Sequence, residues 1–120
     1  MGTVTHPLLL LFFIVLSGGM LGIAKGQAPG QGAWCVAKPS ATDQELRNNI
    51  EFACSFVNCN MIQSGGTCYE PQTLISQASV AMNLYYQKEG RNFWNCNFRN
   101  SAIISVIDPS FGDCKYEYTK

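Results

Sequence analysis

Apolar residues recur every three or four positions in two stretches of the chain, and this spacing predicts two amphipathic helices. The first begins at Thr42, because Thr42 and Glu45 form a capping-box pattern in which each side chain accepts a hydrogen bond from the other's backbone N–H. An apolar stripe then follows within residues 46–57. Phe52 and Phe56 lie one turn apart on a different face, where they either pack under a loop or form an exposed aromatic patch; for Phe52 we expect packing.

The second predicted helix follows a polar loop. Pro71 suits its first turn, and Lys88 followed by Gly90 is an ordinary helix ending. Tyr86 lies at the edge of the apolar stripe, so we expect its side chain to be half exposed. The stripe covers about a third of the helix circumference and consists of Leu74, Ile75, Ala78, Ala81, Met82 and Tyr85.

Two short β-prone runs, residues 93–98 and 102–107, are separated by the polar residues 99–101, which predicts a β-hairpin. Residues 108–112 have the composition of a turn that brings Cys114 back to the fold. We therefore expect an α+β fold, with two α-helices packed on a small antiparallel β-sheet.

The unbroken apolar run at residues 8–16 is too short to span a bilayer, which requires about 20 apolar residues. It has the length of a signal-peptide core, with small residues that suit cleavage after Gly26. A membrane anchor reaching Ile23 is the weaker alternative, and we expect no anchor after cleavage. The predicted organisation is a signal peptide at 1–26, a flexible lead-in at 27–33, one folded domain at 34–116 and a tail at 117–120.

An even number of cysteines within a short exported chain predicts a disulfide framework. Structural zinc sites show pairs two to four residues apart and often include histidine. Here only one close pair exists, with four residues between its cysteines, so disulfides are favoured over zinc. The six cysteines are Cys35, Cys54, Cys59, Cys68, Cys96 and Cys114.

Charge and composition narrow the function. From Gln27 onward there are seven basic and eight acidic residues, a balance that argues against nucleic acid or an anionic membrane as partner. The single histidine, His6, lies in the predicted signal peptide, so no Ser-His or Cys-His nucleophile pair is expected. Glycoside hydrolysis requires only two carboxylates, but each acidic residue fits a cap, a turn or a solvated helix position. We expect no enzyme activity, metal or cofactor.

Aromatic and amide side chains remain as candidate ligand contacts. Neutral sugars present C–H faces that stack on aromatic rings and hydroxyls that pair with polar groups, and binding surfaces commonly combine an apolar platform with a few polar groups. Tyr85 and Trp34 are expected to be structural. The predicted contacts are Tyr69, Tyr86, Gln63, Trp94 and Glu70, and Phe111, Gln72, Gln87 and Asn92 are further candidates.

Several short motifs occur together in a recognisable order. They are Trp34-Cys-Val-Ala-Lys-Pro39, Ala41-Thr-Asp43, Ile62-Gln-x-Gly-Gly66, Cys68-Tyr-Glu-Pro71, Ala81-Met-Asn-Leu-Tyr-Tyr-Gln87, Gly90-Arg-Asn92 and Asp108-Pro-Ser-Phe-Gly112. In this combination the chain resembles carbohydrate-binding module family 43 over essentially all of residues 34–114. That module is found at the C-terminus of plant endo-β-1,3-glucanases, in plasmodesmal callose-binding proteins and alone in small olive-pollen-allergen-like proteins.

The resemblance implies binding of β-1,3-glucan (callose or laminarin) in the plant cell wall without catalysis. Together with the predicted signal peptide, this leads us to expect a secreted glucan-binding protein, and we expect it to be a monomer. The resemblance also implies a disulfide pattern among the fifteen that six cysteines allow. Two alternatives stay open: an endo-β-1,3-glucanase-like enzyme, and a disulfide-rich defence or signalling protein with a protein partner. The implied disulfides are Cys35–Cys96, Cys54–Cys59 and Cys68–Cys114.

Overall fold

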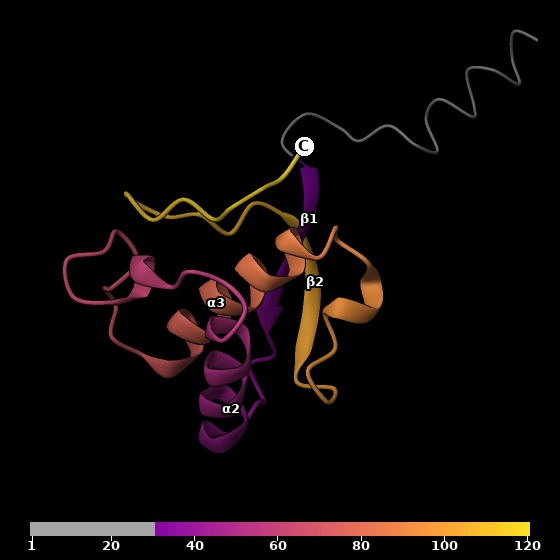
Figure 1. The fold of residues 1–120 in the computed structure, drawn as a ribbon, viewed down its shortest axis with the longest axis horizontal. Coiled ribbons are helices and arrows are strands. Elements are labelled where there is room, and N and C mark those ends of the chain that lie inside the picture. Colours follow the sequence, from indigo (N-terminus) through magenta and orange to yellow (C-terminus); the bar gives the residue numbers. More distant parts are fainter. Residues whose placement is uncertain (1–30) are drawn as a thin grey trace, which may run out of the picture. The chain divides into compact units, whose positions relative to one another are not determined.

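A computed structural model describes residues Gln31–Lys120 of the chain; the predicted signal peptide and its cleavage site lie outside this range. The described part contains two α-helices, two β-strands and two short 3-10 helices (Figure 1). The predicted α+β class is confirmed. In chain order the elements are β1 (Gln31–Ala37), α2 (Asp43–Cys54), η1 (Asn60–Ile62), α3 (Leu74–Lys88), η2 (Phe93–Asn95) and β2 (Ala102–Ile107).

The helix α2 begins as predicted, with both hydrogen bonds of the capping box formed between Thr42 and Glu45. The start predicted for α3 is wrong. Thr73 is its N-cap and accepts a hydrogen bond from the backbone N–H of Ser76. Pro71 precedes this cap, where its carbonyl accepts from the N–H of Thr73 in a tight turn. A hydroxyl that satisfies a free N–H of the first turn determines the boundary here.

The predicted hairpin between residues 93–98 and 102–107 is also wrong. β2 pairs with β1 in an antiparallel sheet, with Cys35 opposite Ile104, while residues 93–95 form the 3-10 helix η2. The disulfide from Cys96 to Cys35 brings the η2 segment close to β1. The strand that pairs with β2 therefore comes from the far end of the domain, a long-range pairing that local β-propensity does not reveal.

All three disulfides implied by the family resemblance are confirmed, and no described cysteine is free. Two of them join residues 61 and 46 positions apart, and the third closes a short loop after α2. In the chain-entropy account each contributes about 2–4 kcal/mol by restricting the unfolded chain. The cross-links therefore supplement the limited core that a domain this small can form.

The edge of β1 that does not face β2 is covered by side chains of α3. Residues four apart on a helix rise about 6 Å, which nearly matches the rise of about 6.8 Å for residues two apart on a strand. Polar side chains at that spacing therefore meet alternate backbone groups of β1 along its length. The three hydrogen bonds are Gln87 Nε2 to Ala33 O (2.9 Å), Cys35 N to Asn83 Oδ1 (3.1 Å) and Ala37 N to Ser79 Oγ (3.0 Å).

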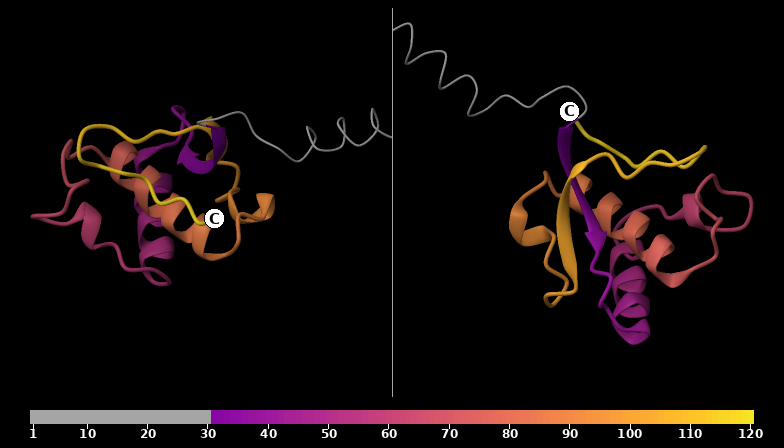
Figure 2. Two further views of the ribbon diagram at one scale, coloured as in Figure 1. Left: turned by 90° about the horizontal axis from the view of Figure 1, so that it is seen from above. Right: turned by 180° about the vertical axis from the view of Figure 1, so that it is seen from behind.

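The same helix also holds the C-terminal segment, which runs across α3 toward the start of β1 (Figure 2). Asn83 Nδ2 donates to the carbonyl of Glu117 (2.9 Å), and the N–H of Thr119 donates to Gln87 Oε1 (2.9 Å). The Arg91 guanidinium lies 4.6 Å from the centre of the Tyr118 ring. The residues predicted as a tail are thus bonded to the fold in this structure.

Candidate functional site

A groove of about 630 Å³ lies where α2, the end of α3, η2 and the segment that follows η2 come together. This volume is in the range of small-molecule and sugar-sized sites. It is lined by Glu45, Asn48, Asn49, Phe52, Tyr85, Trp94, Asn95, Phe98 and Arg99.

The base of the groove is a cluster of aromatic rings from three segments. Phe52 lies 5.2 Å from Tyr85 and 6.0 Å from Phe98, measured between ring centres, and both pairs meet edge to face. Phe56 packs against Phe52 at 5.1 Å but lies outside the groove lining. Phe52 and Phe56 remain 46% and 50% exposed. The exposed aromatic patch is therefore formed, and the packing expected for Phe52 is wrong.

Trp94 forms one wall of the groove from the short helix η2. Its side chain is 63% exposed, and the neighbouring Phe93 is 73% exposed. The two rings meet edge to face at 5.2 Å, and both stay open to solvent. An exposed tryptophan beside half-exposed rings is a platform on which an apolar face can stack.

Polar groups surround these rings. Asn95 and Arg99 line the groove, and within Gln31–Lys120 their side-chain donors make no hydrogen bond. Asn48 accepts from Gln44 Nε2 through its side-chain oxygen, which leaves its NH2 group toward solvent. The carboxylate of Glu45 caps α2 through one oxygen. The groove thus offers several donors and a single carboxylate next to the aromatic rings.

The structure corrects the placement of Tyr86, for which we expected a half-exposed side chain. Tyr86 is 2% exposed and belongs to the core cluster with Cys35, Ala78 and Met82. Burial raises the pKa of its phenol, an effect that the nearby Arg91 partly opposes. A ring in this position is not available as a stacking surface.

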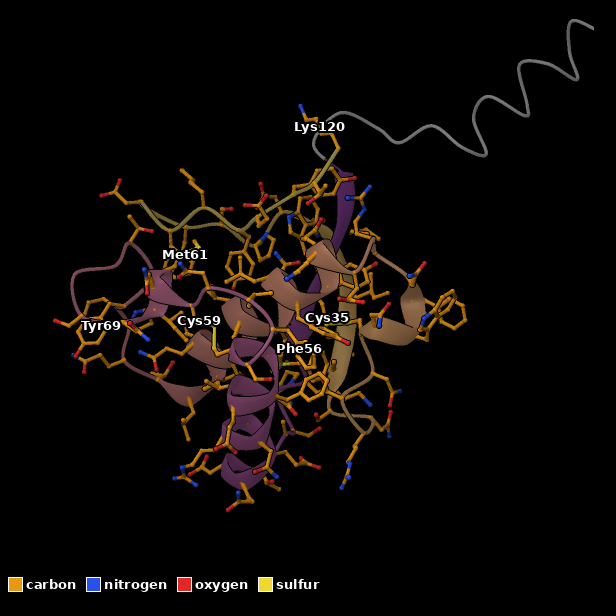
Figure 3. All side chains as sticks on the ribbon, viewed as in Figure 1. Cys35, Phe56, Cys59, Met61, Tyr69 and Lys120 are labelled. Carbon is orange, nitrogen blue, oxygen red and sulfur yellow. A yellow bond between two sulfur atoms is a disulfide. The ribbon has the colours of Figure 1, made fainter. Side chains whose placement is uncertain are left out.

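Three other predicted contacts lie together, but away from the groove. Gln63, Tyr69 and Glu70 belong to the loop between η1 and α3, and none of them lines the groove. Figure 3 shows the Tyr69 side chain at the outer end of this loop, whereas Phe56 lies beside α2. Of the five predicted contacts, only Trp94 is a groove residue.

The remaining candidates have structural partners or lie elsewhere. Gln87 is 2% exposed and uses its amide to hold β1 and the C-terminal segment. Asn92 donates to the carbonyl of Glu89 just after α3, and Gln72 donates to Glu70. Phe111 is 40% exposed outside the groove.

Tyr85, which we expected to be structural, lines the groove instead. The sequence contained one signal for this arrangement. Phe52 and Phe56 are four residues apart and lie off the apolar stripe of α2, with Phe56 just beyond the end of that helix, and this pattern indicates an exposed aromatic surface. No sequence pattern indicated that Phe98 and Arg99 would line the groove, because their positions depend on an unusual backbone turn.

The lining of the groove lacks the paired carboxylates that the usual glycosidase mechanism needs. Hydrolysis of a glycosidic bond by the usual route requires two carboxylates facing each other across the sugar, and the lining contains only Glu45. Among residues 31–120 no cluster of histidine, cysteine or acidic side chains could hold a metal ion. In the same range no helix has the length and apolar character needed to cross a membrane.

Comparison with known proteins gives consistent matches. The family model of the X8 domain matches residues 33–103. The chain is 49% identical over 87 residues to a glucan endo-1,3-beta-glucosidase of Triticum aestivum, covering 72% of this chain but 19% of the wheat protein. It is 41% identical over 96 residues to the major pollen allergen Ole e 10 of Olea europaea, covering 78% of both chains.

A further relative is plasmodesmata callose-binding protein 5 of Arabidopsis thaliana, 43% identical over 89 residues, which cover 72% of this chain and 49% of that protein. The chain thus spans about a fifth of the wheat glucosidase, about half of the callose-binding protein and most of the pollen allergen. In the glucosidase, the matched region is a small part of a longer protein.

Proposed function

The chain belongs to the X8 domain family, the carbohydrate-binding module family that its motifs resemble, and from this premise we propose that it is a secreted, non-catalytic module that binds β-1,3-glucan in the plant cell wall. Two of its relatives are named for the same polymer, one as an enzyme that acts on it and one as a protein that binds callose. Binding the glucan chain is the function that both would share through this module.

The observation that carries the proposal is the groove of about 630 Å³ with half-exposed rings at its base. Glucose residues have apolar C–H faces and hydroxyl edges, and they carry no charge. Trp94 and Phe52 offer ring faces on which the C–H faces can stack. Asn95 and Arg99 offer unpaired donors for the hydroxyls. One carboxylate and one guanidinium in the lining leave the groove balanced in charge, which suits a neutral polymer.

The single carboxylate of the groove also supports binding without catalysis. One oxygen of Glu45 is held by the backbone N–H of Thr42 at 2.8 Å, so this side chain already serves the helix cap. No described cysteine is a free thiol. The three disulfides support export, since such cross-links form and persist in oxidising compartments.

Affinity electrophoresis in gels containing laminarin tests the proposal. We expect the protein to be retarded by laminarin, and Trp94→Ala to lose most of this retardation. Phe111→Ala is the matched control, because Phe111 is also a half-exposed ring but lies outside the groove. Unchanged mobility of the wild-type protein in laminarin, or release of reducing ends from it, would contradict a non-catalytic glucan-binding module.

A further inference from the structure

Three consecutive residues just before β2 have a left-handed backbone. The φ angles of Phe98, Arg99 and Asn100 are +49°, +55° and +65°. This region brings the Cβ of an L-residue close to the following carbonyl oxygen, and residues other than glycine visit it as single positions rather than in runs. Phenylalanine and arginine have no side-chain reason to prefer it. Such strain persists only where the surroundings enforce it, and it concentrates at functional sites.

Hydrogen bonds within the turn enforce this conformation. The side-chain oxygen of Asn97 accepts from the N–H of Asn100 at 3.1 Å, and its carbonyl accepts from the N–H of Ser101, also at 3.1 Å. The hydroxyl of Ser101 donates back to the carbonyl of Phe98 at 2.5 Å. The strained residues are thus enclosed between two side chains that bind their backbone.

Two further elements hold the turn from outside. From α2, Asn49 Nδ2 donates to the Ser101 hydroxyl at 2.9 Å. From the end of β1, Lys38 donates to Asn100 Oδ1 through its ammonium group at 2.8 Å, and its backbone N–H donates to the Ser101 carbonyl at 2.9 Å. Asn49 and Ser101 are 6% and 2% exposed. The turn is therefore fixed before any ligand arrives.

The consequence is the position of two side chains. The ring of Phe98 packs 5.9 Å from Tyr85 and 6.0 Å from Phe52, which completes the aromatic base of the groove. Arg99 follows as a wall of the same groove, and no hydrogen bond occupies its guanidinium within the described residues. We propose that this left-handed turn is a preorganised wall of the glucan groove, with Arg99 as a specificity-determining residue that binds ligand hydroxyls and Ser101 as the residue that positions it.

The inference rests on the proposed function, because it assigns roles within the same groove. A guanidinium presents five donors in a rigid planar fork. The turn fixes the point from which the Arg99 side chain extends, so the fork reaches the hydroxyls along one edge of a sugar chain in the groove. Arg99 should therefore favour β-1,3-linked over β-1,4-linked glucose, whose free hydroxyls lie in a different pattern. Preorganisation raises affinity because less ordering remains to be done on binding.

The test compares Arg99→Gly with Arg99→Ala in calorimetric titrations with laminarihexaose and cellohexaose. Both variants lose the guanidinium, so we expect both to lose about tenfold in affinity for laminarihexaose and to discriminate less between the two sugars. The thermal midpoint of Arg99→Gly should be higher than that of Arg99→Ala, because only glycine adopts a positive φ freely. Arg47→Ala, which removes the same charge from an exposed position of α2, should bind as the wild type does.

Ser101→Ala and Ser101→Thr test the positioning role. The alanine variant should lose several-fold in affinity at a temperature where it remains folded, and the threonine variant, which keeps the hydroxyl, should recover it. Wild-type affinity in both Arg99 variants, or in Ser101→Ala, would overturn the inference while leaving glucan binding intact. A wild-type protein that binds neither sugar would overturn the proposed function and the inference together.

Discussion

The two sides of α3 differ in a way that reverses the usual distribution of polar and apolar groups. On the side facing β1 and the C-terminal segment, Asn83 and Gln87 are 1% and 2% exposed. Next to its other side, which faces the groove, Phe52 of α2 and Trp94 of η2 are 46% and 63% exposed. Amides are buried where aromatic rings would be expected, and rings are exposed where amides would be expected. Buried polar groups and exposed apolar surfaces are the informative exceptions in a fold.

The two exceptions have different causes. The amides are buried because β1 has a second edge, whose N–H and C=O groups must find partners away from water. Asn83 and Gln87 supply them, so α3 takes the place of a neighbouring strand. The rings are exposed although nothing in the fold requires it. An apolar surface that packing leaves uncovered is a candidate binding site, and the comparison thus separates side chains that stabilise the fold from side chains that we propose to bind ligand.

The largest effect on stability should come from Asn83→Ala. Asn83 accepts from the N–H of Cys35 and from Gln87, and it donates to the carbonyl of Glu117. Its removal leaves the buried N–H of Cys35 unpaired, at about 1–3 kcal/mol, and breaks the part-buried bond to Glu117, so we expect the free energy of unfolding to fall by about 3 kcal/mol in urea titrations. Asn48→Ala, in the groove, should change it by less than about 0.5 kcal/mol. An equal loss of stability in the two variants would contradict the distinction between side chains that stabilise the fold and side chains proposed to bind ligand.

Raising the pH should cause the next largest loss of stability, through tyrosines that pack on α3 or belong to it. Burial raises the pKa of Tyr116 to about 12, with an opposing hydrogen bond from Ser79, and it raises the pKa of Tyr86 as well. Unfolded tyrosine loses its proton near pH 10. Between about pH 10 and 12 the unfolded chain therefore binds fewer protons than the folded one, and stability falls as pH rises.

For Tyr116 alone, the stability that is fully present below pH 10 should decrease by about 2–3 kcal/mol by pH 12. Urea unfolding curves across this range measure the decrease, and Tyr116→Phe should make it shallower. A profile that is the same in the variant would show that Tyr116 is not the group responsible.

Phe52→Ala should separate binding from stability on the groove side. A fully buried phenylalanine costs about 3–5 kcal/mol when truncated to alanine, but Phe52 is 46% exposed, so we expect a loss of about 1–2 kcal/mol in the free energy of unfolding. Affinity for laminarihexaose should fall about tenfold because the base of the groove is removed. Calorimetry on the folded variant checks this, and a large stability loss with unchanged affinity would assign Phe52 to the core.

The smallest effect should come from Tyr69→Ala. Tyr69 was among the contacts predicted from sequence, but it lies on the loop between η1 and α3 and does not line the groove. We expect affinity for laminarihexaose to change by less than twofold. A tenfold loss would place the ligand on that loop and would remove the groove from consideration.

Local signals in the sequence were sufficient for some of these features. The Thr42–Glu45 cap was predicted correctly because both of its bonds lie within four residues. The pairing of β2 with β1 was not, because it joins residues about seventy positions apart. The disulfide pattern came from the family resemblance, since spacing alone leaves several patterns open.

The faces of α3 show why the site was only partly predicted. Residues 78, 82 and 86 form the buried apolar row, and residues 79, 83 and 87 form the buried polar row beside it. An apolar stripe read from the sequence leaves the polar row out of the buried face. The sequence pattern does not show that polar side chains can be buried by hydrogen bonding to the edge of a strand. The predicted stripe was therefore centred on the wrong part of the helix surface. We expected Tyr85 to be structural and Tyr86 to be half exposed, whereas Tyr85 lines the groove and Tyr86 is buried. Phe98 and Arg99 depend on a left-handed turn that their residue types do not favour.

An NMR titration of the ¹⁵N-labelled protein with laminarihexaose tests most directly whether the groove is where glucan binds. The account predicts that the largest shifts occur at the indole N–H of Trp94, the side-chain amides of Asn48 and Asn95, and the backbone of Phe98 and Arg99. Shifts gathered on residues 63–70 instead, or no shifts at saturating sugar, would contradict it.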